Sequence, residues 1–132
     1  MKNISKAALL LLLFSSQSQA HHSFAVHFVP EGLVEITGTV DSFRFSNPHG
    51  VLTFTQTLPD GSTAQWRAET NSPNVLRRRG WSRDSIKSGE QVTVTGYPAR
   101  DGTSYMRIEK VAFADGRELV GQARSAPASE KD

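Results

Sequence analysis

The sequence predicts a mainly β domain, a small five-stranded barrel of the OB type with a short helix between strands three and four. Three observations favour this fold. Apolar and polar residues alternate in several short stretches, turn motifs separate these stretches, and the period changes to a helical one only once, after the third stretch. A small open β-sandwich is the alternative architecture.

Alternation begins early in the chain. Within residues 24–28, Phe24, Val26 and Phe28 fall on one face of a predicted strand, which ends at the turn residues 30–32. His27 falls on the opposite face, where we expect it to be solvated.

The next strand is predicted to bend. From Val34 to Val40 every second residue is small or apolar, and the parity then flips at Phe43 and Phe45. A parity flip within one strand is typical of a β-bulge, which bends a sheet as barrel closure requires.

A hairpin follows, framed by turns at residues 47–50 and 59–62. Its two strands carry the alternating residues Leu52, Phe54, Ala64, Trp66 and Ala68.

The helical connection is predicted from its ends. Ser72 and Pro73 are typical of a helix cap followed by the first helical position, and Gly80 is a good terminator. Alternation then returns over residues 91–97 and around Met106 and Ile108, shifts phase at Val111 and Phe113, and ends in a short hairpin at residues 115–120.

The first twenty residues are typical of a cleaved export signal, with Lys2 and Lys6 before a short apolar run and small residues up to Ala20. We therefore expect a periplasmic or secreted protein without stable membrane insertion after cleavage. The expected organisation is a signal peptide (1–20), one barrel domain (21–120) and a disordered tail (121–132).

Cleavage would change the charge balance. It removes two of the 15 lysines and arginines, and the remaining basic residues equal the 13 acidic residues in number, so the mature chain is formally neutral. Export and this neutrality argue against a nucleic-acid partner. The chain has no cysteine, so disulfides and thiolate metal sites are excluded.

Several short motifs resemble family 6152 of the domains of unknown function, a group of short exported bacterial proteins. They lie at residues 21–24, 37–40, 47–49, 72–74, 78–81, 92–98 and 114–116. The resemblance covers nearly all of the mature chain and implies export, but it implies no activity.

Three of the four histidines lie close to the predicted cleavage site. An N-terminal His21 would offer its α-amine and ring Nδ1 as a chelate, and a third nitrogen would suit tetragonal Cu(II). His49 is the preferred third ligand and His22 the alternate, whereas His27 would require the chain to turn back. Solvated surface histidines are the simpler interpretation. For zinc the sequence offers no evident fourth ligand, and for calcium it offers no cluster of carboxylates.

A second group comprises Arg77, Arg78, Arg79 and Trp81. The arginines could bind an anion or the carboxylates of a partner. Basic residues in the last turn of a helix also complement its dipole, and Trp81 fits a packing role at the helix end.

The sequence thus favours an exported β-barrel binding protein that binds Cu(II) through its mature N terminus. A metal-free module that binds a protein, sugar or small anion on the barrel face is the alternative. An enzyme ranks last, because the serines and carboxylates show no catalytic pairing and a copper-dependent oxidase has no support of its own.

Overall fold

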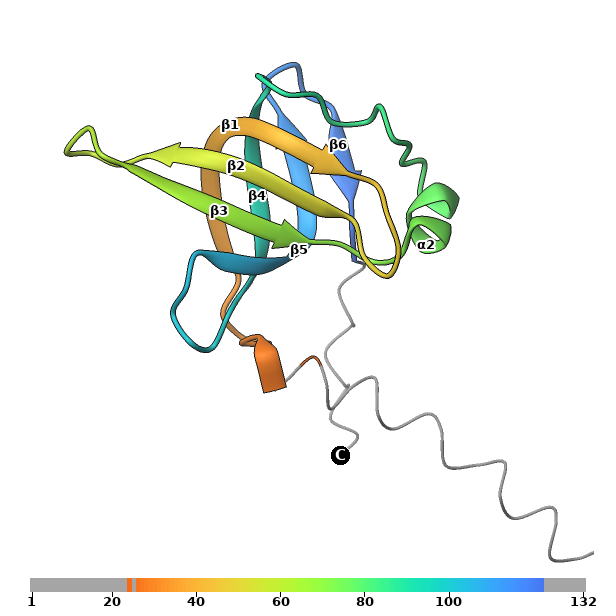
Figure 1. The fold of residues 1–132 in the computed structure, drawn as a ribbon, viewed down its shortest axis with the longest axis horizontal. Helices are drawn as coiled ribbons and strands as arrows, with labels where there is room; N and C mark the ends of the chain where they lie inside the picture. Colours follow the sequence, from red (N-terminus) through yellow and green to blue (C-terminus); the bar gives the residue numbers. More distant parts are fainter. Residues whose placement is uncertain (1–23, 25, 123–132) are drawn as a thin grey trace, which may run out of the picture.

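The computed structural model describes residue 24 and residues 26–122 (Figure 1). The elements within them are β1 (Val34–Arg44), β2 (Val51–Thr57), β3 (Thr63–Glu69), α2 (Pro73–Arg78), β4 (Gln91–Pro98), β5 (Tyr105–Phe113) and β6 (Glu118–Val120). The predicted order of three strands, a short helix and further strands is therefore confirmed. None of the helices in this part of the chain is long and apolar enough to cross a membrane.

Five strands close into a barrel. The antiparallel pairs β1–β2, β2–β3, β1–β4 and β4–β5 form most of the sheet. A short parallel pairing of β3 with β5, which includes Glu69 opposite Arg107, joins the two edges. Strand β6 adds to the second half of β5. The predicted OB-type barrel is confirmed, and the open sandwich is wrong because the β3–β5 pairing closes the sheet.

The predicted bend in β1 is present. The β1–β2 register shifts between Val40 and Ser42, where the sequence changes parity. Just before this bulge, a Cβ on Gly38 would lie 2.5 Å from the Thr55 carbonyl oxygen of β2. Only glycine allows the two backbones to approach this closely where the sheet coils.

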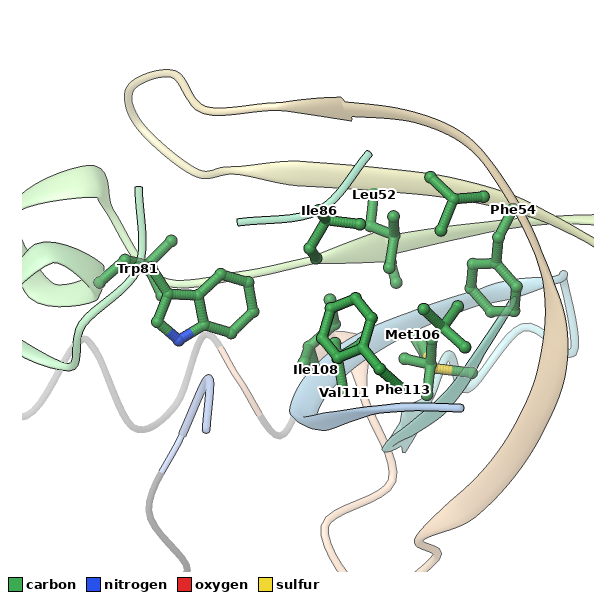
Figure 2. Close-up of a cluster of buried hydrophobic side chains, with 13 residues drawn as sticks. Leu52, Phe54, Trp81, Ile86, Met106, Ile108, Val111 and Phe113 are labelled. Atoms are coloured by element: carbon green, nitrogen blue, oxygen red, sulfur yellow. The ribbon is translucent and has the colours of Figure 1, made fainter. Parts of the chain in front are cut away.

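The barrel interior is one continuous apolar cluster (Figure 2). Its buried members are Val40, Leu52, Phe54, Ala68, Leu76, Trp81, Ile86, Val92, Val94, Met106, Ile108, Val111 and Phe113. Because no disulfide contributes, burial of these side chains supplies the main favourable term for folding.

Helix α2 covers one end of the barrel with its buried Leu76 (Figure 1). Pro73 stands at its start as predicted, although the side chain of Ser72 makes no capping hydrogen bond. The helix ends at Arg78, Gly80 follows with a φ of 85°, and the Trp81 amide donates to the Leu76 carbonyl at 3.1 Å. This is a Schellman-type end, and it turns Trp81 back onto the core.

The strand predicted over residues 24–28 is wrong. The amide of Phe28 donates to the Phe24 carbonyl at 2.9 Å, which is a helical turn. Residues four apart share one face of a helix, and the two phenylalanine rings lie 5.4 Å apart on that face. Aromatic packing of this face against the barrel thus overrides the local alternation, while His27 is exposed as expected.

Two hydrogen bonds join the barrel to the residues just after the predicted domain end at residue 120. The amides of Gly121 and Gln122 both donate to the Glu109 carbonyl, at 2.7 and 3.1 Å. The start of the predicted tail is therefore bonded to β5. The predicted leader, His21, His22 and residues 123–132 lie outside the described residues.

Candidate functional site

His49 lies in the loop between β1 and β2, beside the end of β3. The loop is held there because the amide of Gly50 donates to Asn71 and the Gly50 carbonyl accepts from the amide of Thr70. The ring Nε2 of His49 consequently lies 3.2 Å from Oε1 of Glu69, the last residue of β3.

Glu69 is the centre of a polar cluster on the seam where β3 meets β5. The Tyr105 hydroxyl donates to its Oε2, and Arg107 Nη1 lies 3.3 Å from its Oε1. Arg107 Nη2 also donates to the side-chain oxygen of Asn71 at 2.5 Å. We call His49, Glu69, Asn71, Tyr105 and Arg107 the Glu69 cluster. The parallel β3–β5 register brings its members together.

The cluster holds an ion pair at low exposure. The side chains of Glu69 and Arg107 are 15% and 12% exposed. Burial lowers the pKa of the Arg107 guanidinium, and the Glu69 charge opposes this shift. Arginine keeps its proton under such conditions, so the pair is ionic and close to neutral overall.

Two nitrogen atoms of the cluster are buried without a hydrogen-bond partner within the described ranges. They are Nδ1 of His49 and Nε of Arg107. Buried polar atoms are nearly always paired, and an exception can indicate a bound ion or a functional role. The nitrogen of His49 is the more informative of the two, because a neutral imidazole nitrogen can bind a metal.

Of the three predicted metal ligands, only His49 belongs to the described residues. Within this part of the chain, no group of three or more histidine, cysteine, aspartate or glutamate residues is arranged to hold a metal. A metal bound at His49 would therefore need donors from outside it. His27 is exposed and has no place in the Glu69 cluster.

The N-terminal segment meets the barrel beside this cluster. The ring of Phe28 lies 5.3 Å from the ring of Tyr105, whose hydroxyl binds Glu69. Phe28 forms a β-bridge with Ala99, and the amide of Arg100 donates to the His27 carbonyl at 3.0 Å. The chain is thus anchored at residues 27 and 28, a few residues after the predicted cleavage site.

The residues predicted to bind an anion or a partner do not share one set of contacts. Arg79 Nη1 donates to the Gly121 carbonyl, and Trp81 Nε1 donates to the Val120 carbonyl at 2.9 Å. Arg77 lies over the Phe45 ring at 5.2 Å, and Arg78 is exposed. Two of the four side chains therefore contact the last residue of β6 and the residue that follows it.

Replacing Trp81 with phenylalanine should lower the free energy of unfolding by about 1 kcal/mol, because the part-buried hydrogen bond to the Val120 carbonyl is lost while an aromatic ring is kept. Urea denaturation followed by circular dichroism would measure the change. The exposed Arg78, replaced by alanine, is the control and should change stability by less than about 0.5 kcal/mol. Equal effects of the two substitutions would contradict a role of the indole hydrogen bond.

Sequence reasoning missed most of the Glu69 cluster. Tyr105 and Arg107 alternate with the buried Met106 and Ile108, so the sequence places them on the outer face of their strand. That pattern could have marked them as outward-facing. It could not show that Glu69, from a strand far away in sequence, lies opposite Arg107.

The fold and the cluster define a class: a small closed OB-type β-barrel with a partly buried ionic cluster on its closing seam. The model of the Family of unknown function (DUF6152) matches residues 9–107, and the chain belongs to this family. The resemblance seen in the sequence motifs is thereby confirmed. Comparison with curated proteins finds no match.

Proposed function

We propose that this protein is exported to the periplasm, is cleaved after Ala20, and binds Cu(II) through the new N-terminal His21 together with His49. The amine and ring of His21 supply two nitrogen donors, and His49 supplies the third, a set suited to tetragonal Cu(II). His22 is the alternate third ligand. The role would be metal handling.

One observation carries this proposal: a short series of side-chain contacts joins the anchored start of the barrel to His49. Phe28 packs on Tyr105, Tyr105 binds Glu69, and Glu69 contacts His49. The segment from His21 to Phe28 would extend about 25 Å if the helical turn at residues 24–28 unwound, and less with the turn kept. In the proposed site, His21 reaches His49 by movement of this segment, with the barrel strands unchanged.

The nature of the donors supports the same metal. The described residues offer no cysteine and no cluster of carboxylates around His49. Imidazole and amine nitrogens favour Cu(II) over the hard cations, which prefer oxygen ligands. The Arg107 charge next to Glu69 also makes this carboxylate a poor direct ligand for a cation.

The test is a Cu(II) titration of mature protein that begins at His21, followed by electron paramagnetic resonance. Mass spectrometry of the exported protein would first establish whether the chain begins at His21. We expect tight binding and a nitrogen-rich tetragonal spectrum. A protein with one extra N-terminal residue should bind at least about tenfold more weakly, because its α-amine is displaced from the chelate.

Two histidine substitutions locate the third ligand. His49→Ala should weaken binding, whereas His27→Ala is the matched control and should not, because the side chain of His27 is exposed and is not a member of the Glu69 cluster. If only the extra residue weakens binding, His22 replaces His49 as the third ligand. If neither the extra residue nor His49→Ala has an effect, the copper proposal is refuted and the metal-free binding module becomes the better account.

A further inference from the structure

His49 touches Glu69 through one ring nitrogen only. Nε2 lies 3.2 Å from Oε1 of the carboxylate, whereas Nδ1 is buried without a partner in the described part of the chain. A carboxylate accepts hydrogen bonds, so this contact is favourable when Nε2 carries the ring hydrogen. In the neutral ring this leaves the free electron pair on Nδ1.

Glu69 is itself fixed in orientation. The Tyr105 hydroxyl holds Oε2, and Arg107 Nη1 and His49 Nε2 share Oε1. Arg107 is held in turn by the side chain of Asn71 at 2.5 Å. Because both oxygen atoms are engaged, the carboxylate can turn away from His49 only by breaking its contact with Tyr105 or with Arg107. The Glu69 and Arg107 side chains are largely shielded from water, which makes such a break costly.

We propose that Glu69 is the positioning residue of the copper site: it keeps the ring hydrogen of His49 on Nε2 and so makes Nδ1 the nitrogen that binds Cu(II). This inference rests on the proposed function. Histidines that bind metals usually donate their other N–H to a carboxylate, a backbone carbonyl or water, which sets the tautomer and the ring orientation. The metal also becomes the partner that the buried Nδ1 otherwise lacks.

Because Nδ1 is buried, copper binding there requires the His49 ring to turn. The side chain of His49 is 41% exposed, so the ring is not enclosed by the barrel. Nε2 lies nearer than Nδ1 to the axis of the Cβ–Cγ bond. Rotation about this bond therefore displaces Nδ1 farther than it displaces Nε2 from Glu69.

The first measurement needs no metal. Long-range ¹⁵N–¹H spectra of the mature protein with ¹⁵N-labelled histidine distinguish the two tautomers, and the spectrum of His49→Ala assigns the His49 signals. We expect the hydrogen on Nε2 in the wild-type protein. In Glu69→Gln we expect a mixture of tautomers, because a neutral amide can either accept from or donate to the ring. Glu118→Gln, which changes an exposed carboxylate on β6, should leave the tautomer unchanged.

The second measurement is the Cu(II) affinity of the same proteins, with backbone amide spectra as the check that each remains folded. Glu69→Gln should weaken binding by about 10- to 100-fold, as loss of such an outer partner typically does, and Glu118→Gln should not. A wild-type His49 with its hydrogen on Nδ1 would overturn the inference about Glu69 but not the copper proposal. Equal affinity in wild type and Glu69→Gln would overturn it too. Failure of the wild-type protein to bind Cu(II) would refute the proposed function, and the inference with it.

Discussion

Replacing Phe54 with alanine is expected to lower the free energy of unfolding by about 3–5 kcal/mol. Phe54 is fully buried on β2, and its ring stacks on Trp66 of β3 at a centroid distance of 6.5 Å. It also lies against Gly38, where β1 coils over β2. Truncation would leave a cavity between three strands whose backbones are fixed by hydrogen bonds, so collapse into the space is restricted (Figure 2).

Urea denaturation monitored by circular dichroism measures this loss, with Val120→Ala as the control. Val120 is 45% exposed on β6, so its truncation should change stability by no more than about 0.5 kcal/mol. A loss below about 1 kcal/mol for Phe54→Ala would mean that the barrel interior repacks freely, which contradicts a single close-packed core.

Replacing Glu69 with alanine should have the second large effect, a loss of about 3 kcal/mol. The substitution leaves the Arg107 guanidinium at 12% exposure without its carboxylate, and it removes the acceptor of the Tyr105 hydroxyl. Breaking a buried ion pair by removing one partner is costly because the remaining charge has been taken out of water.

The exposed pair Lys110–Glu118, at 3.1 Å, provides the comparison. Glu118→Ala should cost less than about 1 kcal/mol, because water already solvates both charges. Adding Arg107→Met to Glu69→Ala should restore part of the lost stability, since it removes the uncompensated charge. Equal losses for Glu69→Ala and Glu118→Ala in denaturant would show that burial of the Glu69 cluster has no energetic consequence.

Patterns of short range predicted most of the barrel. The bulge after Val40 follows from the parity flip in the sequence. A strand with one buried face must change the parity of its apolar residues where one extra residue is inserted. The ends of α2 follow from Pro73 and Gly80, whose backbone preferences act within a few residues. The segment at residues 24–28 was the exception, because its alternation fits a strand while its phenylalanines, four apart, equally fit a helical turn.

The candidate site was much less predictable. His49 could be selected as a metal ligand from its residue type, and Arg79 and Trp81 could be selected for their charge and aromaticity. The sequence does not show that Arg79 and Trp81 donate to carbonyls near the end of β6. Nor does it show that His49 has a carboxylate neighbour, because Glu69 is far from it along the chain.

By itself, the sequence determined the β-rich class, the order of elements, the position of the helix and the family. These properties depend on side-chain periodicity and on the local backbone preferences of proline and glycine, which act independently of distant contacts. Only the tertiary structure decided which strands close the barrel and therefore which polar side chains meet. The pairing of Glu69 with Arg107 depends on the parallel β3–β5 register. That register is fixed by packing of the whole core, because no local interaction brings the two strands together.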